Sequence, residues 1–254
     1  MSNVTEIPVA KLTGTHYARI LIYPSSDETK ARERVRELSS LGVVSLIFTG
    51  ATLIDGVPVL GKGCVGIVVL AMLDDVPVAL KIRRSDADRA TMSNEGRLLR
   101  VANSVNVGPR LITQTKNFLA MQFIKGLPLF RWAEGQSAGK MRATKTVVGE
   151  LLSSCFRLDA IGLDHGELSH APRNVLIDKS DSPWIVDFES ASTTRRTANV
   201  TSLLQYFLYG RISKSLNAPK IFPRKGKIIR ALTEYKRDST VENFDRVLRV
   251  LDLT

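Results

Sequence analysis

Hydrophobic and polar residues alternate with a strand-like period from Ala51 onward. A turn is predicted at Asp74-Asp75, and Lys125-Gly126-Leu127-Pro128 is typical of a connector that ends the strand-rich region. The strands predicted from this pattern span residues 52–60, 64–72, 77–82 and 117–124. This part of the chain is therefore predicted to form an antiparallel sheet.

Apolar residues with a helical period dominate the rest of the chain. Ser85 and Asp88 are predicted to cap a helix that runs to about Asn103, with Met92, Leu98, Leu99 and Ala102 near one face. Further helices are predicted over residues 139–161, which Gly162 ends, and over residues 199–209. Ser239 and Glu242 form a capping box for a last helix ending near Leu251.

Residues 1–50 are predicted to form a small αβ extension. Strands are expected over residues 18–23 and 43–48, and a helix capped within residues 25–28 is expected to end near Ser40, before Gly42. Such a short unit buries little surface alone, so we expect it to pack on the sheet formed by the residues after it. We interpret it as a structural brace, with a short nucleic-acid-binding module as the alternative.

The chain has 254 residues and a net charge of +11. Its amino-acid composition is that of an ordinary globular protein. No apolar run reaches the roughly 20 residues that a bilayer-spanning helix needs, and the first residues do not have the pattern of a secretory signal. The two cysteines, Cys64 and Cys155, favour free thiols in a reducing compartment, so we expect a cytoplasmic protein without membrane association.

Much of the positive charge is concentrated late in the chain, where few acids accompany it. A basic face of this kind attracts polyanions such as RNA, although a solvated surface is an equal alternative. The basic residues are Arg211, Lys214, Lys220, Arg224, Lys225, Lys227, Arg230, Lys236 and Arg237, and Pro219 and Pro223 interrupt the segment.

A glycine-rich turn, G-x-G-x-x-G-x-V, connects the first two strands of the predicted sheet, from Gly61 to Val68. Backbone amides of such a turn can approach phosphate oxygens closely. A β-branched run comes next, where a dinucleotide-binding fold needs a helix, which disfavours that fold. Lys81 ends an apolar strand and is costly to bury unpaired. We expect Glu95, on the following helix, to point towards it.

Residues 163–189 hold a His, two carboxylates and an Asn within one run. Residues 175–177 and 184–186 are predicted to pair as a hairpin, which brings Asn174 and Asp187 to the same end with Glu167 on the loop before them. Carboxylate and amide oxygens suit a divalent cation. A surface hairpin with solvated acids is the alternative.

Together these motifs resemble the protein-kinase-like superfamily over residues 52–210. The H-G-E-L-S loop is similar to the small atypical kinases: the Rio family, the kinase of the tRNA-threonylcarbamoylation complex and aminoglycoside phosphotransferases. It is most similar to a compact archaeal set described as predicted serine/threonine protein kinases. The resemblance implies an α+β, bilobal fold with an antiparallel-sheet N-lobe over residues 51–125 and a helical C-lobe over residues 126–254.

The resemblance also implies ATP and Mg²⁺ or Mn²⁺ as cofactors and a role for each matching residue. The catalytic residues would be Glu167, Lys81, Asp187 and Asn174, with Glu167 at the position where Asp is usual. Asn174 and Asp187 would also bind the metal. The residues implied for nucleotide binding are Gly61, Lys62, Gly63, Gly66, Val68, Ala79, Lys81, Glu95, Met121, Gln122, Phe123 and Ile124.

Three departures from the pattern stand out. Glu167 is one methylene longer than Asp, and the stretch from Glu167 to Asn174 is two residues longer than usual. Glu189 stands where Gly normally follows the Asp-Phe pair. No A-P-E motif is present, so the usual peptide-docking platform is not expected.

Four functions fit these observations. The first is an atypical serine/threonine kinase that uses ATP and Mg²⁺ and acts on a protein hydroxyl. The second is an ATPase that works as a conformational switch on an RNA or ribonucleoprotein partner, bound through the basic C-terminal face. A catalytically weak nucleotide-binding pseudokinase and a small-molecule kinase are the remaining alternatives.

Overall fold

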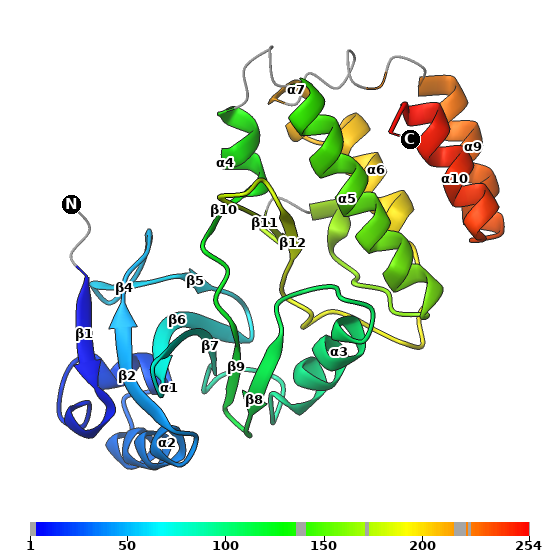
Figure 1. Ribbon diagram of the computed structural model, residues 1–254. Coiled ribbons are helices and arrows are strands. Elements are labelled where there is room, and N and C mark those ends of the chain that lie inside the picture. The colour runs from blue at the N-terminus through cyan, green and yellow to red at the C-terminus, as the bar shows by residue number, and fades with distance from the viewer. Residues whose placement is uncertain (1–3, 136–140, 171–172, 216–221, 223–224, 254) are drawn as a thin grey trace. The chain divides into compact units, whose positions relative to one another are not determined.

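The structure is a computed structural model that describes residues 4–135, 141–170, 173–215, 222 and 225–253 (Figure 1). The chain divides into two compact units, Met1–Arg100 with Arg110–Phe123, and Val101–Pro109 with Ile124–Thr254. Each unit has its own sheet and helices, and each is described by itself.

A seven-stranded antiparallel sheet forms the first unit, in the order β1-β2-β6-β7-β9-β8 with β5 paired to β6. A separate hairpin, β3 with β4, accompanies it. The strands are β1 (Thr5–Pro8), β2 (Val43–Phe48), β3 (Thr52–Ile54), β4 (Val57–Val59), β5 (Gly61–Lys62), β6 (Gly66–Leu73), β7 (Val76–Arg83), β8 (Leu111–Gln114) and β9 (Phe118–Gln122). The helical elements are η1 (Val9–Lys11), α1 (Ala18–Ile22), α2 (Glu28–Ser40) and α3 (Ser93–Asn103).

One face of this sheet packs against α1 and α2 and forms the core of the unit. Alternate residues of β6, β7 and β9 point into it, among them Ile67, Leu80 and Phe118, and meet Leu21 of α1 and Leu38 of α2. The N-terminal extension is thus part of the sheet and of its core, in agreement with its expected packing on the later strands.

Buried Arg34 of α2 ties this extension to the end of β7. Its Nη1 donates to the carbonyls of Leu21 and Arg83, and its Nη2 donates to Asn117 Oδ1 at 3.2 Å. Burial lowers the pKa of Arg34 to about 10. Because these bonds join three segments, α2 braces the strand that carries Lys81.

The second unit is mainly helical and contains a three-stranded antiparallel sheet in the order β10-β11-β12. Helix α5 packs against α6, and α9 and α10 lie side by side (Figure 1, orange and red). Its elements are β10 (Gly126–Pro128), α4 (Leu129–Glu134), α5 (Met141–Ala160), η3 (Leu168–His170), β11 (Val175–Asp178), β12 (Pro183–Ile185), α6 (Asn199–Tyr209), α7 (Ile212–Ser215), α9 (Lys225–Arg237) and α10 (Val241–Leu251).

Most predicted elements are present at close to their predicted bounds. Strand β2 and helix α6 match residue for residue, and the predicted apolar stripe of α5, from Val147 to Leu158, is buried. The positive φ of Gly162, 72°, comes just after the end of α5. Residues 139–140, where the α5 prediction began, and Pro219 and Pro223 lie outside the described residues.

Two strand predictions are wrong. Residues 18–22 form helix α1, in which four of the five side chains are buried, and a single polar residue, Arg19, is too little to show a period. Residues 52–60 form a hairpin and not one strand, because Asp55 and Gly56 take φ values of 49° and 81°. Two consecutive left-handed residues are the geometry of a tight hairpin turn, for which Asp-Gly is a strong signal.

Other boundaries also differ from prediction. Helix α3 begins at Ser93, several residues after Ser85 and Asp88. The cap of α10 is Thr240, whose side chain accepts from the Asn243 amide, and not Ser239. The predicted connector at residues 125–128 contains β10, which pairs with β11. Helices α4, α7 and α9 were not predicted.

Candidate functional site

The glycine-rich segment forms a tight hairpin between β5 and β6. Gly61 pairs with Val68 and Lys62 pairs with Ile67, and the Gly63 amide donates to the Gly66 carbonyl at 2.8 Å. This confirms the predicted strand–turn–strand setting. Strand β6 continues directly from the last glycine where a dinucleotide-binding turn needs a helix, so such a turn is excluded.

The sheet face opposite the α1–α2 core carries the residues predicted to bind a nucleotide. Val68 lies opposite Lys81 on the neighbouring strand, and Ala79 lies opposite Met121. Cross-strand partners project to the same face, and so do residues two apart on one strand. Val68, Ala79, Lys81 and Met121 therefore share one face of the sheet.

Lys81 and Glu95 form a buried ion pair on this face. Lys81 Nζ donates to Glu95 Oε1 at 2.8 Å, and both side chains are 5% exposed. Burial of two charges is costly unless each is well paired, so such pairs are found where a site requires them. The predicted contact from α3 to the third strand is present.

Gly66 leaves room for this lysine. A Cβ placed at position 66 would lie 2.9 Å from Lys81 Cγ and 3.0 Å from Lys81 Cε. The φ of Gly66 is not in the left-handed region, so the close approach, and not backbone conformation, requires glycine here. The last glycine of the motif thus positions the lysine stem.

Lys62, at the tip of the hairpin, contacts the N-terminal extension. Its Nζ donates to the Tyr23 hydroxyl at 2.6 Å and lies 4.3 Å from the centre of the Tyr23 ring. Arg84 lies over the same ring and donates to the Gly63 carbonyl at 3.0 Å. Tyr23 and Arg84 therefore hold the hairpin in one conformation.

Residues 122–124, predicted as an adenine-binding hinge, lie at the end of β9 and just beyond it. The Gln122 amide donates to the Arg110 carbonyl at 2.9 Å, and the Ile124 carbonyl accepts from the Gly126 amide at 3.1 Å. The Ile124 amide makes no hydrogen bond to another backbone group within the described part of the chain. It is a backbone donor that a ligand could use, and Phe123 precedes it.

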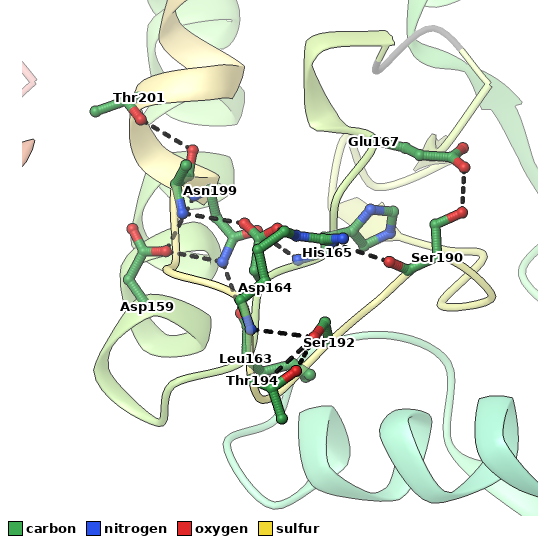
Figure 2. Close-up of polar contacts among 12 residues, drawn as sticks. Asp159, Leu163, Asp164, His165, Glu167, Ser190, Ser192, Thr194, Asn199 and Thr201 are labelled. Atoms are coloured by element: carbon green, nitrogen blue, oxygen red, sulfur yellow. Dashed lines mark hydrogen bonds and ion pairs between the residues drawn. The ribbon is translucent and has the colours of Figure 1, made fainter.

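In the second unit, the β11–β12 hairpin brings Asn174 beside the loop that carries Glu167. Val186 N–H donates to the Asn174 carbonyl at 2.9 Å, and Asn174 Nδ2 donates to Glu167 Oε2 at 3.2 Å. The other carboxylate oxygen, Glu167 Oε1, accepts from the Ser190 hydroxyl (Figure 2). The longer loop between Glu167 and Asn174 thus still places the two side chains in contact.

Asp187 comes directly after this hairpin and has a φ of 68°. A non-glycine residue in the left-handed region is uncommon, and such strain concentrates at functional positions. Asn174 turns its Nδ2 towards Glu167, so its Oδ1 faces elsewhere and makes no hydrogen bond to another described residue. An amide oxygen and a nearby carboxylate are a donor set that fits Mg²⁺.

Buried His165 joins the two loops of this site. Its amide donates to Asn199 Oδ1 at 2.8 Å, and its Nε2 lies 3.1 Å from the Val186 carbonyl (Figure 2). A carbonyl only accepts, so Nε2 carries the proton. Burial lowers the pKa of His165, which is therefore neutral at pH 7.

Asn199 and Asp159 extend this network into the helical core. Asn199 Nδ2 donates to Asp159 Oδ1 at 2.8 Å and to the Leu163 carbonyl at 2.7 Å. Asp159 Oδ2 accepts from the Tyr235 hydroxyl at 2.8 Å. Burial raises the pKa of Asp159. Helices α5, α6 and α9 thereby fix the loop on which Glu167 lies.

Gly166 lies against Arg195, whose Nε donates to Asp164 Oδ2 at 2.5 Å. A Cβ at position 166 would lie 2.3 Å from Arg195 Nη2 and 2.8 Å from the Ser190 carbonyl, and the φ of Gly166 is 88°. Both the conformation and the close approach require glycine. The loop of residues 164–167 is therefore packed directly on residues 190–195.

The structure brings Lys81 together with Glu95, and Glu167 together with Asn174. The contacts of His165, Ser190, Arg195 and Asn199 were not predicted. Apart from the bond between Arg195 and the Ser190 carbonyl, the contacts described above link residues more than 20 positions apart, and no local pattern indicates such contacts.

Comparison with known families decides the assignment. The model of the RIO domain matches residues 78–205, from β7 into α6. The chain belongs to the RIO domain family. The RIO domain is kinase-like, so the α+β fold with an antiparallel sheet is a protein-kinase-like fold. For this RIO protein, membership indicates a kinase- or ATPase-type activity that uses ATP and a divalent metal ion.

A search of curated proteins finds no match to this RIO chain. Across the described residues, no helix combines the length and apolar character needed to cross a bilayer.

Proposed function

We propose that this RIO protein is an ATP- and Mg²⁺-dependent phosphotransferase that acts on the Ser or Thr hydroxyl of a protein. The observation that carries the proposal is the buried Lys81–Glu95 ion pair beside Gly66. A lysine held by a glutamate next to a glycine-rich hairpin is the arrangement that orients an ammonium group towards nucleotide phosphates.

In this proposal the hairpin of Gly61, Lys62, Gly63 and Gly66 covers the phosphates. Lys62 is exposed, and its side chain exchanges its contact with Tyr23 for phosphate oxygens. Adenine is held at residues 122–124, where the Ile124 amide is the donor, with Val68, Ala79 and Met121 against the ring. The shared sheet face of these three side chains supports this assignment.

The metal ion is assigned to Asn174 and Asp187. Mg²⁺, or Mn²⁺, neutralises charge on the transferring phosphoryl group when it is bound. Asn174 contributes its Oδ1, which the hydrogen bond from Nδ2 to Glu167 orients. The same hydrogen bond positions Glu167, which we propose accepts the proton of the attacking hydroxyl.

The free cysteines support work in a reducing compartment, and we propose the cytoplasm. Cys155 is buried and Cys64 is exposed, and neither forms a disulfide. Proteins with free thiols and no disulfides are typical of reducing compartments.

The test measures transfer from radiolabelled ATP to a panel of unfolded proteins rich in Ser and Thr. Wild-type chain is compared with Asp187→Ala, and Lys116→Ala serves as a control because Lys116 is exposed and lies in a turn. Transfer should require Mg²⁺ and disappear in Asp187→Ala only. ATP binding without any transfer or hydrolysis would instead identify a pseudokinase, and transfer to small molecules alone would identify a small-molecule kinase.

A second candidate function is an ATPase that acts on an RNA or ribonucleoprotein partner. Helix α9 favours it, because Lys225, Lys227 and Arg230 are exposed and form no ion pair with another described residue. Lys225 also lies 5.4 Å from the centre of the Tyr209 ring, and Tyr209 is 61% exposed. Lys220 and Arg224, predicted in the same basic face, lie outside the described residues.

Release of phosphate from ATP, measured without added protein, distinguishes this ATPase from the protein kinase. RNA should stimulate the release, the stimulation should decrease steeply with salt, and the Lys225→Ala/Lys227→Ala/Arg230→Ala variant should lose it. Release that is insensitive to RNA, together with transfer to protein, favours the kinase.

A further inference from the structure

The Ser190 hydroxyl is hydrogen-bonded to Glu167, the carboxylate assigned above as proton acceptor. Ser190 Oγ donates to Glu167 Oε1, although the two residues are 23 positions apart in the chain (Figure 2). A serine hydroxyl that donates its proton to this carboxylate is what a protein substrate presents to a kinase. Here the chain itself supplies it.

Several contacts hold this pair in place. Asn174 Nδ2 donates to the second oxygen of Glu167 at 3.2 Å, which fixes the carboxylate. Arg195 Nη2 donates to the Ser190 carbonyl at 3.0 Å, and Arg195 is anchored by Asp164. Gly166 allows the two loops to approach closely. The hydroxyl is thus positioned by residues on both sides of the pair.

Backbone pairing between the same loops adds to this support. Asp164 N–H donates to the Ser192 carbonyl at 2.9 Å, and Ser192 N–H donates to the Asp164 carbonyl at 2.8 Å. This two-bond bridge lies two residues beyond Ser190 and three residues before Glu167. It limits how far the hydroxyl can move from the carboxylate.

We propose that Ser190 is an intramolecular phosphoryl acceptor, modified by the chain that contains it. The inference rests on the proposed function, because it uses the same nucleoside triphosphate as donor. Ser190 Oγ forms a bond to the γ-phosphorus of ATP as the bond from that phosphorus to the bridging oxygen breaks. The hydroxyl proton passes to Glu167, ADP leaves, and the products are phosphoserine and ADP.

Phosphoserine at this position changes the local balance of charge. The new dianion lies beside the Glu167 carboxylate, and like charges at this distance repel. The Arg195 guanidinium is near enough to pair with it, since it already contacts the Ser190 backbone. Modification therefore separates Ser190 from Glu167 and releases the carboxylate for another hydroxyl.

The experiment incubates full-length, dephosphorylated chain with Mg-ATP and no added substrate. Intact mass should increase by one phosphoryl group, and fragment spectra should place it on Ser190. Ser190→Ala should lose that label, and Thr193→Ala should keep it. Thr193 is a matched control because its hydroxyl lies in the same loop, is exposed and has no hydrogen bond to another described side chain.

Two further measurements test whether the step is intramolecular. The half-time of labelling should not change on dilution of the protein. Wild-type chain mixed with a tagged Asp187→Ala chain should label itself and not the tagged chain. Labelling that slows on dilution, or label on the tagged chain, overturns the intramolecular acceptor.

ATP binding and turnover separate this inference from the proposed function. A chain that binds Mg-ATP and phosphorylates other proteins, yet carries no label on Ser190, overturns the inference alone, and leaves Ser190 as a positioning residue for Glu167. A chain that neither binds nor turns over ATP overturns the proposed function, and with it the acceptor role.

Discussion

The stem of Lys81 passes so close to Gly66 that a Cβ at position 66 would lie 2.9 Å from Lys81 Cγ. Cβ atoms essentially never lie this close to another heavy atom. A side chain at position 66 therefore forces Lys81 to move. The same lysine is the residue that Glu95 holds at 2.8 Å. Position 66 and the ion pair are therefore predicted to be coupled.

Gly66→Ala should lower both the stability of the chain and its affinity for ATP. Overpacking of a buried site costs about 1–3 kcal/mol, and the displaced ammonium no longer faces the phosphates. Denaturant unfolding and calorimetric titration with ATP measure the two effects. Gly61→Ala is the control for stability, because a Cβ at position 61 meets nothing within 4 Å. Equal stability of the two variants would contradict the coupling.

Removal of Lys81 alone should destabilise the fold. Lys81→Met leaves Glu95 buried without its cation, which costs about 3 kcal/mol or more. Lys81→Met/Glu95→Gln removes both charges and should recover most of that stability. Activity should be lost in both variants, because neither offers an ammonium to the phosphates.

A double-mutant cycle over Lys81 and Glu95 checks this prediction. The cycle compares the free energies of unfolding of wild type, the two single variants and the double variant. A double variant that is stable and retains phosphoryl transfer would show that Lys81 serves the fold and not the reaction.

Glu167→Asp should reduce phosphoryl transfer. The structure holds the longer side chain from both sides, with Asn174 on Oε2 and Ser190 on Oε1. An Asp carboxylate is drawn back by one methylene and loses these contacts, and misplacement of about 1 Å can cost about a hundredfold in rate. The measurement is kcat for transfer to protein, with stability as the control. Increased activity would show that the loop also accepts the geometry of Asp.

Much of the fold could be predicted because its elements have clear local patterns. Strand β2 is a short, mostly apolar run that begins directly after Gly42, and α6 is preceded by a polar run, so both were predicted at their observed bounds. Residues 18–22 could not be assigned correctly, because a short run of buried apolar residues looks alike as a strand or a helix. The turn at Asp55-Gly56 had a readable signal that the strand prediction missed.

In the candidate site, too, some contacts could be predicted from the sequence and others could not. Lys81 and Glu95 are 14 residues apart, on a strand and the next helix, and their contact could be predicted from that order. His165 with Asn199 and Asp159 with Tyr235 span 34 and 76 residues. Such contacts depend on how α5, α6 and α9 pack, which no local pattern specifies.

The stability of the chain should decrease as the pH falls below about 6.5 because of His165. Its pKa is lowered from the ordinary value of 6.5, first of all by burial. The unfolded chain therefore binds a proton at a pH where the folded chain does not, and protons favour unfolding. The contribution of His165 is fully present above the unfolded pKa and is lost as the pH falls towards the folded pKa.

Denaturant unfolding in metal-free buffer from about pH 7.5 to 5 measures this dependence. The slope due to one proton is at most about 1.4 kcal/mol per pH unit. His165→Gln keeps a donor for the Val186 carbonyl but does not titrate, so its curve should be flatter than that of wild type. Asp159, whose pKa burial raises, contributes with the opposite sign in both proteins and cancels in the comparison. Parallel curves would mean that folding does not shift the pKa of His165.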